Sequence, residues 1–354
     1  MPDKQFTFVV PGSLDTLTGG YVYDKRIIAE LRQQGWHIDV CHLSDQFPNP
    51  DQAVLAASYA TLMALPRGQP VVIDGLALGV LPETGRRLGH DRPLVGLVHH
   101  PLAMETGLLA ERAAELRFSE RMALATTAQV IAVSATTAAT LTNDYGIEKT
   151  RIKVVPPGTD KAPLAHGSTD GVVRFLSVGS VVPRKGYMVL IAALAKLGAL
   201  PLPWRLTIVG DLTRDVAAAS QLREAIEDAG LSDRVRLLGT VSDERLAALY
   251  DESDVFVLAS FYEGYGMVYT DALARGLPVI GTTGGAIPES LPAGTGILVK
   301  PGDVSSLSGV LQAIVTRPEL RAQHASAARR EAEFLPRWTL SAQLFGRAVA
   351  AVQP

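Results

Sequence analysis

The chain has 354 residues, of which 47% are hydrophobic and 19% are charged, and its formal net charge is -3. This length favours two domains and this composition argues against extensive disorder, while the lack of clustered Lys and Arg argues against nucleic acid as a partner. The one cysteine, Cys41, cannot form an internal disulfide, and its apolar surroundings predict a buried thiol in a reducing compartment.

The first apolar run, residues 6–10, is interrupted by Pro11 and Gly12. It is too short for a signal peptide or a membrane span, so we expect a cytoplasmic protein whose mature chain begins at Met1. The stretch 108–121 is a candidate amphipathic helix, but three arginines balance three glutamates along it. We therefore expect a solvated helix face and at most a peripheral membrane contact.

Short β-branched runs alternate with longer Ala- and Leu-rich segments, which is typical of parallel strands joined by helices. In the first half the expected strands are Thr7–Val10, Ile38–Cys41, Val71–Asp74, Leu94–His99, Gln129–Val133 and Lys153–Val155. In the second half they are Arg174–Val178, Arg205–Val209, Val235–Leu238, Val255–Leu258, Pro278–Gly281 and Gly296–Val299. The predicted fold class is therefore α/β with two Rossmann-like halves.

A polar stretch rich in Gly, Pro and Ser separates the two halves, and we place an interdomain linker at residues 159–171. In each half the first strand runs into a glycine-containing turn and then a helix. This arrangement directs backbone N–H groups toward the end of a parallel sheet, where phosphorylated ligands bind. The segment 329–352 carries Phe334 and Trp338 and is expected to be helical, with a packing role.

The strongest chemical signal is the sequence Ser-Phe-Tyr-Glu-Gly-Tyr-Gly-Met at 260–267. A predicted strand ends near the carboxylate of Glu263, a glycine turn follows, and a helix then carries a second carboxylate, Asp271. Glycines allow the backbone to approach a ligand closely, and a helix start supplies unpaired N–H donors for an anion. One loop therefore combines a carboxylate with an anion-binding helix end.

This segment resembles the E-x7-E signature of retaining GT-B glycosyltransferases of the family 4 type, also called glycosyl transferases group 1. The resemblance implies two Rossmann-like domains that face each other across a cleft holding a nucleotide-sugar donor. It also implies that Glu263 lies near the donor sugar and that Asp271 binds the ribose, although Asp271 is one methylene shorter than the family's usual Glu. The backbone amides expected to touch sugar and phosphate are those of Gly264, Tyr265, Gly266, Met267 and Val268.

The segment 177–186 resembles the family's first loop of the C-terminal domain, in which an Arg/Lys pair clamps the donor diphosphate. Gly179, Arg184 and Lys185 occupy the matching positions. Fixed cations stabilise the charge that develops on the leaving phosphate, which is the chemical reason for such a pair. Gly210 and Thr240 match positions near the base and ribose.

In the first half, Gly19 and Gly20 resemble the family's N-terminal glycine-rich loop, which contacts the β-phosphate. His99 and His100 follow a predicted strand, at the place where family members carry a His that touches the donor sugar, and we favour His99 for this role. The two side chains should point to opposite sides. A zinc site is poorly supported, because no other His or Cys has suggestive spacing.

The expected domains are 1–165 for the acceptor, 172–330 for the nucleotide sugar, and 331–354 as a C-terminal helix that crosses back onto the first domain. The resemblance covers nearly the whole chain and is densest from Gly171 to Asp303. It implies transfer of a sugar from a UDP- or GDP-sugar to a hydroxyl of a small-molecule, glycan or lipid-linked acceptor, with retention of configuration. Neither a metal nor a cofactor is expected, because the Arg/Lys pair replaces a divalent ion and no D-x-D motif is visible.

Three other functions remain open from the sequence. A nucleotide-sugar 2-epimerase shares the architecture, and a catalytically silent sugar-nucleotide-binding protein would explain Asp271. A dinucleotide-dependent oxidoreductase fits less well, because no G-x-G-x-x-G follows the first strand.

Overall fold

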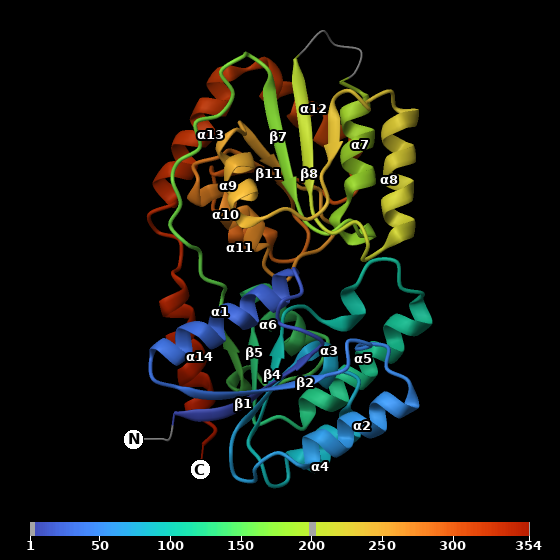
Figure 1. Cartoon of the computed structure of the whole chain (residues 1–354), viewed down its shortest axis with the longest axis vertical. Helices are drawn as coiled ribbons and strands as arrows, with labels where there is room; N and C mark the ends of the chain where they lie inside the picture. The colour runs from blue at the N-terminus through green and yellow to red at the C-terminus, as the bar shows by residue number, and fades with distance from the viewer. Residues whose placement is uncertain (1–3, 198–202, 354) are drawn as a thin grey trace. The chain divides into compact units, whose positions relative to one another are not determined.

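The computed structural model describes residues 4–197 and 203–353. Its internal contacts divide the chain into an N-terminal unit, Met1–Gly158 with Pro336–Pro354, and a C-terminal unit, Thr159–Leu335. Each unit contains one six-stranded parallel sheet covered by helices (Figure 1). The predicted α/β class with two Rossmann-like halves is confirmed, and all twelve predicted strands are present with ends that differ by at most two residues.

The N-terminal unit has the strand order β2-β1-β3-β4-β5-β6. This is a doubly wound order that reverses between β1 and β3, and ligands of such sheets bind at that reversal, beyond the carboxyl ends of the strands. The strands are β1 (Gln5–Pro11), β2 (His37–Leu43), β3 (Val71–Asp74), β4 (Leu94–Val98), β5 (Gln129–Ala132) and β6 (Ile152–Val154). The helices are α1 (Gly19–Gln33), α2 (Gln52–Met63), α3 (Gly75–Leu78), α4 (Pro82–Leu88), α5 (Ala110–Ala125), α6 (Ala135–Asn143) and α14 (Trp338–Ala350), with 3-10 turns at Leu102–Met104 and Lys149–Arg151.

The C-terminal unit has the strand order β12-β11-β10-β7-β8-β9, which reverses between β7 and β10. The strands are β7 (Val173–Val178), β8 (Trp204–Val209), β9 (Val235–Leu237), β10 (Val255–Val257), β11 (Val279–Thr282) and β12 (Gly296–Val299). The helices are α7 (Tyr187–Ala195), α8 (Val216–Asp228), α9 (Asp243–Asp251), α10 (Met267–Ala274), α11 (Ile287–Ser290), α12 (Val304–Thr316) and α13 (Pro318–Glu331), with a 3-10 turn at Pro183–Lys185. Helices α7 and α8 lie on one side of this sheet, and α9, α10 and α11 lie on the other (Figure 1).

The local reasons for these elements are ordinary ones. Alternation along β1 directs Phe6 and Phe8 toward α14, where the ring of Phe345 packs against both, while Val9 joins the core on the opposite face. Some helix starts are capped by short polar side chains: Ser134 accepts a hydrogen bond from the backbone N–H of Thr137, 3.0 Å away. Among the described residues, no helix is long and apolar enough to cross a membrane.

The C-terminal segment differs from the single helix predicted for 329–352. It forms two helices, α13 and α14, separated by residues 332–337, and they belong to different units. Trp338 begins α14 and is buried against Tyr23 of α1, whereas Phe334 in the break is 79% exposed. The packing role is therefore divided: α14 packs in the N-terminal unit, and Leu335 in the break is buried in the core of the C-terminal unit.

The predicted linker also differs from the structure. Residues 159–171 belong to the C-terminal unit, because their backbone groups are hydrogen bonded there. The backbone N–H of Ala165 donates to the carbonyl of Arg275, and that of Gly167 donates to the carbonyl of Asp251. A stretch with linker composition is thus an ordered part of the domain that follows it.

Two smaller predictions need correction. Glu120, counted with the solvated face of the helix at 108–121, is only 1% exposed and accepts a hydrogen bond from the backbone N–H of Leu102, so this face is not uniformly solvated. Burial raises the pKa of Glu120 to about 8. Cys41 is half-buried rather than fully buried, and its partial burial raises the pKa of the thiol.

Candidate active site

In the C-terminal unit, two loops meet where the strand order reverses. Arg184 and Lys185 follow β7, and Glu263 follows its neighbour β10. The loops are joined by the backbone N–H of Phe261, which donates to the carbonyl of Arg184 at 2.8 Å. The two strongest sequence motifs are therefore adjacent in space, although Glu263 lies 78 residues after Lys185 in the chain.

Glu263 lies between the two cations. One carboxylate oxygen, Oε1, is 2.7 Å from Nζ of Lys185, and Oε2 is 2.9 Å from Nη1 of Arg184. Ser260 donates its hydroxyl to Oε1 at 2.6 Å. Burial alone would raise the pKa of Glu263, but Lys185, Arg184 and the Ser260 hydroxyl outweigh it and hold the pKa at about 2. Glu263 is thus ionised at neutral pH, and one excess positive charge remains on the three side chains together.

Helix α10 begins four residues after Glu263. Gly266 precedes its first residue with φ of 92°, in the left-handed region, so the chain turns sharply between the carboxylate and the helix. The first N–H groups of an α-helix lack intrahelical acceptors and favour an anion. Gly264, Tyr265, Gly266, Met267 and Val268, predicted to touch sugar and phosphate, therefore form this turn and helix start.

Asp271 lies half-buried on α10, one turn before Arg275, whose guanidinium covers the ring of Tyr250 at 4.3 Å. Burial first, and then the charges of Asp271 and Arg275 with opposite effects, shift the pKa of Tyr250 upward. The structure places Asp271 on the same helix whose start follows Glu263. Its predicted contact with ribose stays a prediction.

The glycines at the ends of β7 and β8 lie directly against each other. A Cβ atom on Gly210 would lie 1.9 Å from the carbonyl oxygen of Gly179. The two loops can therefore approach this closely only with a glycine at position 210. The backbone N–H of Gly210 also donates to the carbonyl of Gly239, which is followed by the exposed Thr240. The structure thus brings Gly179, Gly210 and Thr240 to one edge of the sheet.

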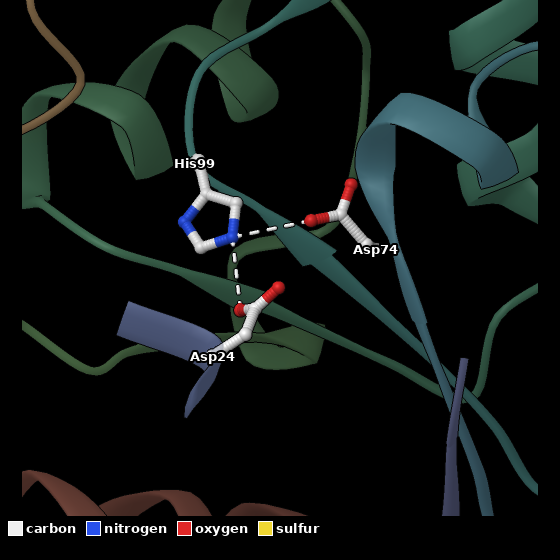
Figure 2. A group of neighbouring side chains, drawn as sticks. All are labelled: Asp24, Asp74 and His99. Carbon is white, nitrogen blue, oxygen red and sulfur yellow. Dashed lines mark hydrogen bonds and ion pairs between the residues drawn. The ribbon is translucent and has the colours of Figure 1, made fainter. Parts of the chain in front are cut away.

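The N-terminal unit contains a second group of charged side chains (Figure 2). His99 follows β4, Asp74 ends β3, and Asp24 lies within α1, the helix after β1. Nε2 of His99 is 3.1 Å from Oδ1 of Asp24 and 3.3 Å from Oδ2 of Asp74. Gly20 lies against the ring, since a Cβ atom there would be 3.2 Å from Cδ2 of His99, and Gly19 is the first residue of the same helix.

The two adjacent histidines have different surroundings. His99 is 17% exposed and joins this group, whereas His100 lies 3.4 Å from the half-exposed carboxylate of Glu105. The expectation that His99, rather than His100, contacts the donor sugar stays a prediction. Asp24, Asp74 and His99 could hold a metal ion, because their ligand atoms lie within 4.8 Å of one another. Within the described ranges they are the one set of three side chains that meets this condition.

Three neighbours of the predicted site residues were not identified from the sequence. Ser260 lies in the quoted motif but carried no role, and Asp74 ends a predicted strand, a position that could have singled it out. Asp24 has no such signal, because an acidic residue inside an amphipathic helix is usually solvated. Only the packing of α1 on the sheet shows that it is buried.

Two family models match the chain. The model described as Glycosyl transferases group 1 matches residues 160–331, and the model described as Glycosyltransferase Family 4 matches residues 17–162. Together the two models span residues 17–331, and the chain belongs to the GT-B glycosyltransferases that they describe.

Curated relatives carry related names. A D-inositol 3-phosphate glycosyltransferase of Pseudarthrobacter chlorophenolicus is 32% identical over 254 residues, which are 66% of this chain and 60% of that protein. An MMP alpha-(1->4)-mannosyltransferase of Mycolicibacterium hassiacum is 28% identical over 325 residues, which are 86% of this chain and 77% of that protein. The alignment thus spans about 60% of the length of the first of these relatives.

Solved structures share the fold. Sucrose-phosphate synthase from Thermosynechococcus elongatus has a TM-score of 0.80 at 21% identity, covering 97% of both chains. Anabaena HepE in complex with UDP-glucose has a TM-score of 0.77 at 20% identity, covering 98% of this chain and 99% of that one. At this level of identity the likeness supports the GT-B architecture alone.

Proposed function

We propose that this protein is a glycosyltransferase that moves a sugar from a nucleoside-diphosphate sugar to a hydroxyl group of an acceptor. The observation that carries the proposal is the arrangement of Glu263 with Arg184 and Lys185 beside the start of α10. It combines two cations and a helix N-terminus at the strand-order reversal of a Rossmann-like sheet, which suits a diphosphate. The family models and the transferase names of the relatives support the same class.

Arg184 and Lys185 would stabilise the departing diphosphate. Negative charge grows on the phosphate oxygen as the bond from the anomeric carbon to that oxygen breaks, and cations already fixed in place need no reorganisation. Glu263 supplies that fixation, because its two oxygens hold one cation each. This contributes a positioning role for Glu263 in addition to the sugar contact implied by the family.

We further propose that transfer proceeds with retention of configuration and without a metal ion. The acceptor oxygen forms its bond to the anomeric carbon on the face from which the phosphate leaves, and the acceptor's proton passes to a phosphate oxygen. Arg184, Lys185 and the α10 start would take the part of a divalent ion toward the diphosphate. The proposed donor is linked to UDP or GDP, and the proposed acceptor is a small molecule, a glycan or a lipid-linked molecule. The proposed location is the cytoplasm.

Thermal shift with a panel of nucleotide sugars tests donor binding first. A donor at 100 times its Kd should add about 2.7 kcal/mol of stability. Turnover of the best donor is then measured in Arg184→Ala and Lys185→Ala. We expect kcat to fall about 10- to 1000-fold in each variant. Arg223→Ala, an exposed arginine on α8, serves as the control.

Unchanged kcat in both variants would remove these residues from the proposed role. Incubation with UDP-GlcNAc alone separates transfer from epimerisation, because an epimerase converts the nucleotide sugar without an acceptor. A protein that binds donors but never turns them over would be a silent sugar-nucleotide-binding protein and would contradict the proposal.

A further inference from the structure

The geometry around His99 decides which of its nitrogens carries a proton. Nε2 faces two carboxylate oxygens, one from Asp24 and one from Asp74, and both can only accept a hydrogen bond when ionised. Figure 2 shows the second ring nitrogen, Nδ1, on the side of the ring away from both carboxylates. When both carboxylates are ionised, Nε2 must therefore hold a hydrogen atom, whatever the state of Nδ1.

Nδ1 is the nitrogen that remains available. It forms no hydrogen bond with any residue in the described ranges 4–197 and 203–353, although the side chain is only 17% exposed. A ring fixed at one nitrogen and unoccupied at the other can present the second nitrogen to a ligand. A Cβ atom at position 20, at the start of α1, would lie 3.2 Å from Cδ2, so Gly20 allows the ring to lie close to that helix.

The two carboxylates are held in different ways. Asp74 uses Oδ1 to accept the backbone N–H of Leu76 at 2.7 Å, which leaves Oδ2 directed at the imidazole. Asp24 is fully buried on α1, and its second oxygen, Oδ2, has no hydrogen-bond partner within the described part of the chain. Burial and the nearby Asp74 raise the pKa of Asp24 to about 7, and a positive charge beside the two carboxylates favours the ionised form of both.

His99 is the group that can supply this charge. The charged groups that act on it are Asp24 from α1 and Asp74 from the end of β3; the remaining neighbour, Tyr23, presents its ring edge at 5.2 Å and donates its hydroxyl to the carbonyl of Val155. Burial lowers the pKa of His99, but the two carboxylates outweigh burial and raise the pKa to about 10. The imidazole is therefore positively charged across the neutral range.

We propose that Asp24 and Asp74 are positioning residues that keep His99 as an imidazolium, with Nε2–H held by the two carboxylates and Nδ1–H offered as a permanent hydrogen-bond donor to an oxygen atom of the substrate. His99 is then a fixed cation and a hydrogen-bond donor, and it does not act as a general base. The identity of the substrate as a nucleotide sugar or its acceptor rests on the proposed function. The charge state of His99 does not.

The charge state can be measured on the wild-type protein. With histidines labelled by nitrogen-15, NMR should show both ring nitrogens of His99 protonated from pH 6 to 9, with assignment by comparison with His99→Gln. In Asp24→Asn and Asp74→Asn the measured pKa of His99 should fall by at least one unit. A neutral His99 at pH 7 in the wild type would overturn the proposal, as would a titration that both substitutions leave unchanged.

Kinetics test the positioning role separately. We expect kcat/KM of Asp24→Asn and Asp74→Asn to fall about 10-fold at pH 7 and to decline further above that pH, whereas the wild type shows no decline caused by His99 below pH 9. Asp39→Asn is the control, because it removes the carboxylate of an exposed His–Asp pair, Asp39 with His37, on β2 of the same unit. Asp74→Glu should recover part of the loss, and equal activity at all pH values in the Asn variants would contradict the role.

Metal titration excludes the competing explanation of this cluster. A divalent ion would need the lone pair of Nε2, which the proposal occupies with a proton. Calorimetry with Zn²⁺ and Mn²⁺ should therefore detect no stoichiometric binding at this cluster. Wild type and Asp24→Asn should give the same result. Stoichiometric binding lost in that variant would show a metal centre and overturn the proposal, whereas absent glycosyl transfer with a charged His99 would count against the proposed function only.

Discussion

In the C-terminal unit one carboxylate, Glu263, lies between two cations, whereas in the N-terminal unit one imidazole, His99, lies between two carboxylates. Both groups lie beyond the carboxyl ends of neighbouring strands at the reversal of strand order. The first has an excess of positive charge and the second an excess of negative charge when all members are ionised. The same position in two similar folds therefore favours different ligand chemistry, and the residues on the loops decide which.

The two groups also depend differently on their surroundings. The Glu263 group is built from two loops joined by a backbone hydrogen bond from Phe261 to Arg184. The His99 group depends on a helix, α1, and Tyr23 of that helix packs against both His99 and Trp338 of α14. A segment from near the end of the sequence, α14, therefore packs on the helix that carries Asp24.

Removing that support should give the largest effect on stability. Trp338 is buried, and Trp338→Ala should lower the free energy of unfolding of the N-terminal unit by about 3–5 kcal/mol. Hydrogen exchange measured by mass spectrometry should show loss of protection in α1 and β1 while β7 to β12 stay protected. Phe334→Ala, at a side chain that is 79% exposed, is the control and should have almost no effect. Equal losses in both units would contradict the division made here.

Neutralising Glu263 tests the opposite group. Glu263→Gln leaves Arg184 and Lys185 beside each other without their carboxylate, so we expect kcat to fall about 100- to 1000-fold. The free energy of unfolding should fall by about 3 kcal/mol, because a buried charge pair is broken. Glu252→Gln, which breaks an exposed pair with Arg245, should cost less than about 1 kcal/mol. Full activity in Glu263→Gln would show that the two cations do not need it.

The two units should respond to pH in opposite directions. The pKa of Glu263 is lowered from 4.5 to about 2, so its contribution to stability is complete above pH 4.5 and is lost as the pH falls through 2. The pKa of His99 is raised from 6.5 to about 10, so its contribution is complete below pH 6.5 and is lost as the pH rises through 10. Burial also raises the pKa of Asp24, which acts in the same direction as His99.

Urea denaturation followed unit by unit with hydrogen exchange measures this difference. The stability difference between wild type and Glu263→Gln should shrink below pH 4.5. For Asp24→Asn the stability difference from wild type should change between pH 3.8 and 7, where Asp24 itself titrates, and again between pH 6.5 and 10, where His99 loses its proton. Parallel pH curves for variant and wild type in either unit would show that the charged group of that unit does not cause the pH dependence of its stability.

The turn at Gly266 gives a smaller effect. An added Cβ atom would be strained at φ of 92° and would lie 2.6 Å from Cδ2 of the buried Tyr269, so Gly266→Ala should lower stability by about 2 kcal/mol. Gly309→Ala, in α12 with open space around the Cα atom, should instead raise stability by about 0.5–1 kcal/mol. Thermal unfolding of both variants decides the point, and a neutral Gly266→Ala would argue against a tight turn before α10.

Much of this molecule could be predicted from local pattern. The twelve strands follow from β-branched runs. Glu263, Arg184 and Lys185 were singled out because each follows a strand in a glycine-containing loop that resembles a family motif. Parallel strands bring such loops to one edge of a sheet, so a residue at a strand end has a predictable place. The burial of Glu120 and the ordering of 159–171 could not be predicted in this way, since both depend on partners distant in the sequence.

Local sequence was therefore sufficient for the elements, their alternation and the residues that chemistry places at strand ends. Strand order, the pairing of Glu263 with two cations and the enclosure of His99 by Asp24 and Asp74 depended on tertiary structure. The physical reason is that a charge acts over a few ångströms in space, and the three members of the His99 group are separated by 25 to 75 residues along the chain. Only folding brings them within that range.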